Sequence, residues 1–260
     1  MINRLAENGW AVDETNYALS IAQQTFPQEC EQLVEALLGM TLNTQEHFIK
    51  RGGGEADQTQ ALSAKLNSYG WVKNNISIEN TIRFSQKFDA FTASSISHEV
   101  DHIGQNEQGK KFALEIEWNN KDEFFDRDFS AFQGLFDLNA IELGIIITRG
   151  PDLENGISNA VQRFFTEQGV QDYDDLQALE NRIVDSNGVS RFSFPTKPQK
   201  DSIEKKLSNQ SFVDAATEVF CSSKYGTSTT TWRQIHKRIE RGTAGRTPML
   251  IIGIPSSIIS

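Results

Sequence analysis

Apolar and polar positions along the chain separate segments with a strand period from segments with a helix period. FALEIEWN carries an apolar residue at every second position from Phe112 to Trp118, which predicts a strand with one apolar face. Residues 122–138 repeat phenylalanine at helical spacing and predict an amphipathic helix. Residues 140–150 and 248–254 are short apolar runs suited to buried strands.

The remaining segments complete a single α/β domain with a mixed sheet. ISHEVDHI has strand character, and GQNEQGKK between it and FALEIEWN is a turn. Helices are expected over 27–50, 58–69 and 228–242, with RGGGEAD as a break after the first of them. We therefore expect four parts: a helical N-terminal part (1–69), core segments 70–150 and 226–254, and a helical excursion (151–225).

Composition narrows the class of protein. The chain has 260 residues, 38% hydrophobic and 23% charged, which is typical of a globular protein with a sizeable core. It has two cysteines, no apolar run long enough for a membrane helix and no apolar leader at its start, so we expect a cytoplasmic protein. The net charge of −10 argues against a generally basic surface but allows a local basic patch.

The stretch HEVDH, residues 98–102, matches the zinc-protease pattern His-Glu-x-x-His. That pattern needs a helix that directs both histidines to one metal, with Asp122 or Glu123 available as a third ligand. Gly104 and a turn follow at once, so a helix would end where the motif is completed. We therefore disfavour a zinc site and interpret His98 and His102 as ordinary polar residues at a strand edge.

The strand interpretation directs attention to carboxylates. Glu115 and Glu117 share the face opposite the apolar stripe, where two like charges repel each other unless water or a cation neutralises them. Pairing of HEVDHI with FALEIEWN across the turn brings Asp101 beside Glu115. Three carboxylates so arranged suit Mg²⁺ and the hydrolysis of a phosphodiester bond. The alternative is a solvated outer face of the sheet.

VDH…ALEIEWNN resembles the nuclease motif PD-(D/E)xK, in the variant where the lysine is replaced. In the same order, GWVKNNISI, AIELGIIITRG and TPMLIIGI resemble segments of type II restriction endonucleases of the BglII, BstYI and BamHI group. These segments span residues 70–254, although 151–225 shows little resemblance. The resemblance implies a restriction-endonuclease-like fold.

Site residues are implied by the same resemblance. Asp101 and Glu115 match the two metal-binding acids, and the backbone carbonyl of Ile116 matches a further ligand. Glu117 stands at the position of the usual lysine and is the expected general base, and Asn75 matches an active-site asparagine. Glu115 follows Asp101 by fourteen positions, which is longer than in BglII or BstYI, and we interpret the difference as an extended hairpin loop.

Two sets of residues complete the expectations. Glu107 is the alternative first acid if Asp101 does not lie at the site. A local basic patch lies in residues 223–247, where side chains at and near a helix N-terminus are expected to contact DNA phosphates. The expected DNA-binding residues are Lys224, Ser228, Thr229, Thr230, Arg233 and Lys237.

The resemblance thus implies an Mg²⁺-dependent type II restriction endonuclease, in which Mn²⁺ can substitute. It implies a homodimer acting on a short palindrome in double-stranded DNA, beside a cognate DNA methyltransferase. A DNA-repair or mobile-element nuclease with the same core is an alternative enzyme. A DNA-binding protein whose carboxylates are only structural is an alternative of another class.

Overall fold

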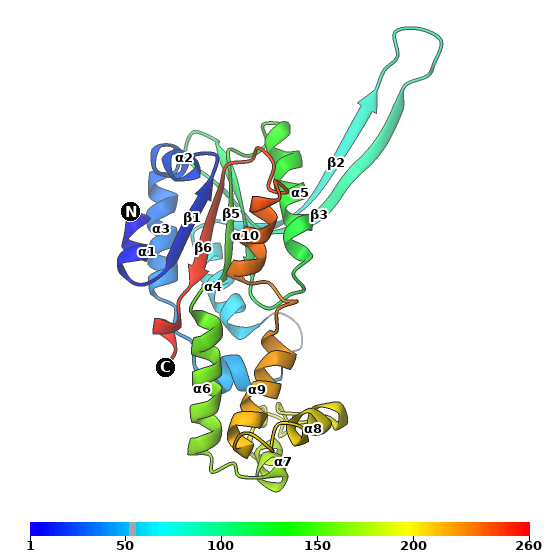
Figure 1. The fold of residues 1–260 in the computed structure, drawn as a ribbon. Coiled ribbons are helices and arrows are strands. Elements are labelled where there is room, and N and C mark those ends of the chain that lie inside the picture. The colour runs from blue at the N-terminus through cyan, green and yellow to red at the C-terminus, as the bar shows by residue number, and fades with distance from the viewer. Residues whose placement is uncertain (52–55) are drawn as a thin grey trace.

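The computed structural model describes residues 1–51 and 56–260, and for Ser94 and Ser95 it describes the backbone alone. A six-stranded sheet of order β1-β6-β5-β4-β3-β2 forms the centre of this described part (Figure 1). Its strands are β1 (Ala11–Thr15), β2 (Val72–Ile82), β3 (Phe91–Gln105), β4 (Lys111–Glu117), β5 (Leu143–Arg149) and β6 (Met249–Ile254). Strands β4, β5 and β6 are parallel, and every other pairing is antiparallel. The predicted mixed sheet is confirmed.

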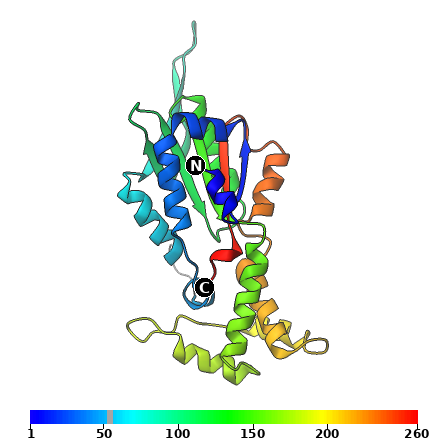
Figure 2. The ribbon, with the colours of Figure 1, turned by 90° about the vertical axis from the view of Figure 1, so that its left-hand side faces the viewer.

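Helices cover both faces of the sheet and extend beyond one end of it (Figures 1 and 2). The N-terminal helices lie on one face, and α5 and α10 lie on the other, while α6 to α9 form a lobe at one end. The α-helices are α1 (Asn3–Glu7), α2 (Ala18–Thr25), α3 (Pro27–Leu38), α4 (Asp57–Ser68), α5 (Phe124–Asp137), α6 (Leu153–Glu167), α7 (Tyr173–Arg182), α8 (Lys197–Glu204), α9 (Phe212–Tyr225) and α10 (Trp232–Glu240). A π-helix, η1 (Thr44–Ile49), and a 3₁₀ helix, η2 (Ser256–Ile258), complete the elements.

Strand β4 separates two hydrophobic cores, because its side chains alternate between the faces of the sheet. Phe112, Leu114, Ile116 and Trp118 belong to the core shared with the N-terminal helices. Ala113 belongs to the core under α5 and α10. This is the alternation that the sequence predicted, and it leaves Glu115 and Glu117 facing α5.

The β3–β4 hairpin explains the long spacing between Asp101 and Glu115. Four residue pairs run from His102–Leu114 to Gln105–Lys111, and a short turn closes them. The Asn106 side chain holds this turn by accepting from the backbone N–H groups of Gln108 and Lys110, at 3.0 and 2.9 Å. The extra length therefore lies in the paired strands rather than in an extended loop.

Three elements differ from the expectations. Strand β1, in the part expected to be helical, pairs with β6 at the sheet edge. The helix expected over 27–50 ends at Leu38, and η1 follows after a break. Strand β2 and the first half of β3 form a long arm that projects from the body (Figure 1). The centre of the predicted break RGGGEAD lies outside the described residues.

In the part of the chain that the structure describes, none of the helices combines the length and the apolar character that crossing a lipid bilayer requires.

Candidate active site

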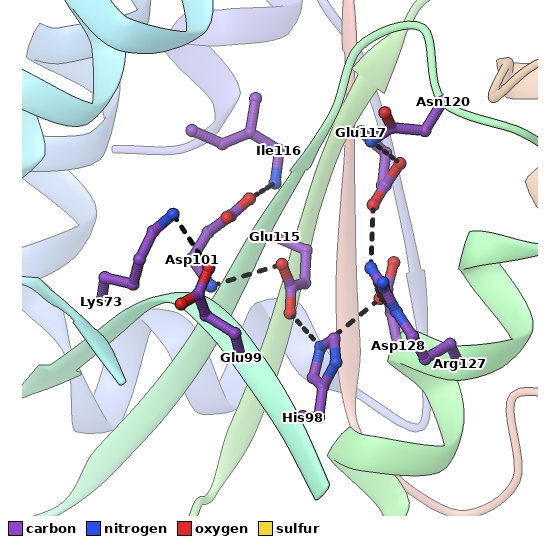
Figure 3. A network of polar contacts seen from close by, with 10 residues as sticks. All are labelled: Lys73, His98, Glu99, Asp101, Glu115, Ile116, Glu117, Asn120, Arg127 and Asp128. Atoms are coloured by element: carbon purple, nitrogen blue, oxygen red, sulfur yellow. Dashed lines mark hydrogen bonds and ion pairs between the residues drawn. The ribbon is translucent and has the colours of Figure 1, made fainter. Parts of the chain in front are cut away.

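The two predicted acids meet where β3 and β4 separate. Asp101 Oδ2 accepts a hydrogen bond from the backbone N–H of Ile116 at 3.0 Å. The backbone N–H of Asp101 donates to Glu115 Oε2 at 3.3 Å (Figure 3). The Asp101 side chain thus accepts the backbone hydrogen bond that β3 would accept if its pairing with β4 continued to Ile116. Both carboxylates lie beside the Ile116 peptide.

Glu115 and Glu117 are buried on the face of the sheet that α5 covers, each with only 2% of its surface exposed. Glu115 Oε1 lies 2.8 Å from His98 Nε2. Glu117 Oε2 accepts from Asn120 Nδ2 at 2.8 Å, and Arg127 Nη2 lies 3.9 Å from its other oxygen. Glu115 and Glu117 share one face of β4, as the sequence predicted. That face is buried, which excludes the alternative of a solvated outer face.

A further acid, Asp128, enters the cluster from α5. It is fully buried, and its Oδ1 lies 3.6 Å from His98 Nε2 and 3.3 Å from Arg127 Nη2. Its Oδ2 has no hydrogen-bond partner among the described residues. Sequence reasoning missed Asp128, although it follows the buried Phe125 by three positions and so lies on the apolar stripe of the helix.

The histidines of HEVDH do not form the zinc-protease arrangement. The motif lies in β3, a strand, so the helix that this signature needs is absent there. His98 is buried against Glu115, whereas His102 faces the other core, with Nδ1 3.3 Å from the Trp71 carbonyl and Nε2 3.2 Å from Ser63 Oγ. The interpretation of both histidines as ordinary polar residues at a strand edge was wrong, because their side chains are buried on opposite faces of the sheet.

Burial and mutual repulsion dominate the electrostatics of the cluster. Burial, followed by the charge of Asp128, raises the pKa of Glu115 well above its usual range and that of Glu117 to about 9. Burial also raises the pKa of Asp128 to about 6 and lowers the pKa of His98. Glu117 therefore holds a proton near neutral pH until a positive charge arrives.

This arrangement fits a divalent cation. The cluster brings together the buried carboxylates of Glu115, Glu117 and Asp128, which are oxygen donors of the kind that Mg²⁺ and Mn²⁺ accept. Among the described residues, the ligand atoms of His98, Glu115 and Asp128 all lie within 4.8 Å of one another. A cation placed here would supply the missing positive charge.

A cleft of about 520 Å³ opens beside Asp101 and the end of β4. Its wall includes Ile116 and Trp118 and a set of basic residues from distant parts of the chain. These basic residues are Lys50, Arg51, Lys73, Arg191 and Lys224. Lys224 was expected from the sequence, but the other four lie outside the basic patch of 223–247 and were missed.

Two other candidates form no hydrogen bond or ion pair with Asp101, Glu115 or Glu117 among the described residues. Asn75 is an exposed residue of β2 that pairs with Glu99 on β3. Glu107 lies in the turn of the β3–β4 hairpin, at the opposite end of the paired segment from Glu115. Since Asp101 lies beside Glu115, the alternative first acid is not needed.

The expected DNA-binding residues have diverse surroundings. Lys224 Nζ donates to the carbonyls of Phe48 and Lys50, at 2.7 and 2.5 Å, and burial lowers its pKa to about 8. Ser228 and Arg233 are exposed, and Lys237 is half-buried.

The three threonines before α10 have structural contacts. Thr229 Oγ1 donates to the Gly226 carbonyl at 2.7 Å and accepts from Arg149, and Thr230 is fully buried. The residue that caps α10 is Thr231, whose Oγ1 accepts from the N–H of Gln234 at 3.2 Å. Helix α10 therefore begins after Ser228, Thr229 and Thr230, the residues that the sequence had placed at its N-terminus.

Comparison with known proteins identifies the family. The model of the family described as restriction endonuclease BglII/BglIII matches residues 10–254, nearly the whole chain. No curated protein matches the chain significantly. The mixed sheet and its flanking helices agree with a restriction-endonuclease-like fold. The chain therefore belongs to the BglII/BglIII family of restriction endonucleases, which are type II site-specific deoxyribonucleases.

Proposed function

We propose that the protein is an Mg²⁺-dependent homodimer that cleaves a short palindrome in double-stranded DNA, with Asp101 and Glu115 as the principal metal-binding acids. The observation that carries this proposal is the meeting of the two carboxylates beside the Ile116 peptide, where β3 and β4 separate. The Ile116 carbonyl is the proposed third ligand. When bound, Mg²⁺ activates a water molecule and stabilises negative charge at the phosphate.

The side chains around these acids orient them and exclude water. His98 holds one oxygen of Glu115 while the backbone of Asp101 holds the other, so this carboxylate is fixed at both ends. Glu117, held by Asn120, is the proposed general base for the attacking water. With its pKa raised to about 9 in the protein alone, Glu117 accepts a proton only when a nearby positive charge lowers that pKa.

The cleft beside Asp101 is the proposed path of the DNA backbone. Arg51 and Arg191 are its proposed phosphate contacts, because Lys50 and Lys73 are already paired with Glu46 and Glu99. Ser228, Arg233 and Lys237 are further proposed phosphate contacts, and Asn75 on the adjacent arm is a proposed active-site residue. Lys224 and Thr230 are already engaged or buried, so we propose that they support the site rather than touch DNA.

A dimer follows from the symmetry of the proposed substrate. A two-fold protein places one copy of its site against each strand of a palindrome. Such an activity is harmful to the cell's own DNA unless a methyltransferase modifies the same sequence, which is the proposed functional partner. The proposed location is the cytoplasm, where this DNA lies.

The test compares DNA binding and cleavage in variants of the two acids. We expect Asp101→Asn and Glu115→Gln to bind target DNA in the absence of metal at least as well as wild type, because the first removes a negative charge near the phosphates and the second replaces a carboxyl whose raised pKa already favours its neutral form. Single-turnover cleavage with Mg²⁺ should fall by at least about a thousandfold, because the metal and its water are lost. The target sequence is first identified by sequencing the ends of digested phage DNA.

Glu107→Gln is the matched control, because it removes an acid of the same hairpin that lies away from the cluster. It should cleave at the wild-type rate. Near-wild-type cleavage by Glu115→Gln in a folded protein would refute the assignment. Light scattering of the protein with its target duplex tests the dimer.

A further inference from the structure

A second set of ligand atoms adjoins the proposed Mg²⁺ site on its α5 side. His98 Nε2 lies 2.8 Å from Glu115 Oε1 and 3.6 Å from Asp128 Oδ1 (Figure 3). The three side chains come from β3, β4 and α5, and all three are buried. One imidazole nitrogen thus faces two carboxylates that belong to different elements.

Asp128 brings a second buried carboxylate to this set. It is fully buried, and no backbone, amide, hydroxyl or guanidinium group of the described residues donates to its Oδ2. Among these residues, its side chain hydrogen-bonds only with another acid, Glu117, and with the partly exposed Arg127. The cation closest to its other oxygen, Arg127, has 48% of its side chain exposed and contacts Asp128 at 3.3 Å. One solvated guanidinium leaves this group of buried carboxylates short of positive charge.

The donor set selects the kind of ion. Mg²⁺ prefers oxygen ligands and binds imidazole poorly, whereas Zn²⁺, Co²⁺ and Mn²⁺ accept one nitrogen with two carboxylates. Metal–ligand bonds of about 2.0–2.2 Å in a tetrahedron separate the ligand atoms by roughly 3.3 Å. The observed 2.8 and 3.6 Å from His98 lie on either side of that separation, and all three ligand atoms lie within 4.8 Å of one another.

We propose that His98, Glu115 and Asp128 form a second metal site, which takes a first-row transition ion such as Zn²⁺ in preference to Mg²⁺. The site is distinct from the proposed catalytic pair because Asp101 is not one of its ligands, and it shares only Glu115 with that pair. Its existence does not depend on the proposed function. Its consequence does: a Zn²⁺ held here draws Glu115 away from Asp101 and inhibits Mg²⁺-dependent cleavage.

Co²⁺ is the probe, because its visible absorption reports both binding and ligand geometry. Chelator-treated, DNA-free protein is titrated with CoCl₂, and the absorption band is then challenged with Zn²⁺ and with Mg²⁺. We expect saturation at one equivalent of Co²⁺ per chain with an intense band typical of low coordination number. One equivalent of Zn²⁺ should remove the band, and a hundredfold excess of Mg²⁺ should leave it.

Four variants assign the ligands. His98→Gln and Asp128→Asn should each weaken Co²⁺ binding at least tenfold. His102→Gln is the matched control, because it removes a buried histidine of the same strand that faces the other core. Asp101→Asn should lose cleavage and keep the Co²⁺ band, so failure of the catalytic assignment and failure of this site give different results. Circular dichroism checks that each variant is folded.

The outcomes are decisive in either direction. Loss of the band in Asp101→Asn with retention in Asp128→Asn would place the ion at the catalytic pair alone and overturn the second site. Wild-type protein that binds no Co²⁺ would overturn it as well. If His98→Gln or Asp128→Asn does not fold, pulsed electron paramagnetic resonance of Mn²⁺ bound to Asp101→Asn decides, because that variant removes a ligand of the catalytic pair. Coupling to a nitrogen nucleus supports the site, and its absence refutes it.

Discussion

Replacing Glu117 with glutamine should stabilise the metal-free protein. Glu117 is buried, and its pKa is raised from an ordinary 4.5 to about 9, first by burial and then by the charge of Asp128. At pH 7 the folded protein holds a proton on this carboxyl that the unfolded chain does not hold. Glutamine has nearly the same shape, still accepts from Asn120 and needs no proton.

The magnitude follows from proton linkage. Because the pKa is higher in the folded state, the folded protein binds more protons and loses stability as pH rises from 4.5 towards 9. Proton uptake at pH 7 costs about 3 kcal/mol at roughly 1.4 kcal/mol per pH unit above the ordinary pKa. The advantage of Glu117→Gln should therefore approach zero below pH 4.5, reach about 3 kcal/mol at pH 7 and grow further at pH 8.

Urea denaturation in EDTA, repeated from pH 5 to pH 8, measures this difference directly. Glu99→Gln is the matched control, because Glu99 lies on the adjacent strand with 53% of its side chain exposed and should change stability by less than about 0.5 kcal/mol at each pH. A variant less stable than wild type at pH 7 would refute the reasoning. A difference that does not vary with pH would refute it equally, because the gain would then not come from proton uptake.

Three further predictions concern the scaffold and the metal. Lys224→Met should lower the free energy of unfolding by about 2 kcal/mol, because the carbonyls of Phe48 and Lys50 lose their shared donor; an effect as small as that of the exposed Lys205→Met in urea denaturation would contradict this. Gly104→Ala should cost about 1–3 kcal/mol, because a Cβ there would lie 2.1 Å from Phe112 Cζ, and an unchanged melting temperature would argue against it. Mn²⁺ should replace Mg²⁺ in cleavage assays and Ca²⁺ should support DNA binding alone, whereas full cleavage in excess EDTA would exclude a metal-dependent reaction.

The arrangement of the acids on β3 and β4 could be predicted because it depends on the sequence of one hairpin. The alternation from Phe112 to Trp118 fixes which face carries Glu115 and Glu117. The turn at 106–110 sets the register that places Asp101 beside Glu115. These features need no knowledge of the rest of the chain, so the shared face of Glu115 and Glu117 and the pairing that brings Asp101 beside Glu115 could be predicted from short segments.

The contacts that sequence reasoning missed are made between distant segments. Lys224 looked like a free surface cation, but its ammonium is bound by carbonyls that lie 176 and 174 positions earlier. Strand β1 is short and half polar, and its place at the sheet edge depends on β6, which lies at the other end of the chain. The apolar residues of β2 fall at alternate positions, 72, 76, 78 and 82, which is a strand period that sequence reasoning overlooked because most of β2 is polar and exposed.

The buried acids of the candidate site lower the stability of the metal-free protein. Glu115, Glu117 and Asp128 all have a raised pKa, so each opposes folding of the metal-free protein near neutral pH. A core selected only for stability would replace them with apolar or neutral side chains. A ligand that binds only the folded state returns that free energy as its own binding energy. Because a cation that binds here must displace the protons that these carboxyls hold, its affinity should increase as the pH rises.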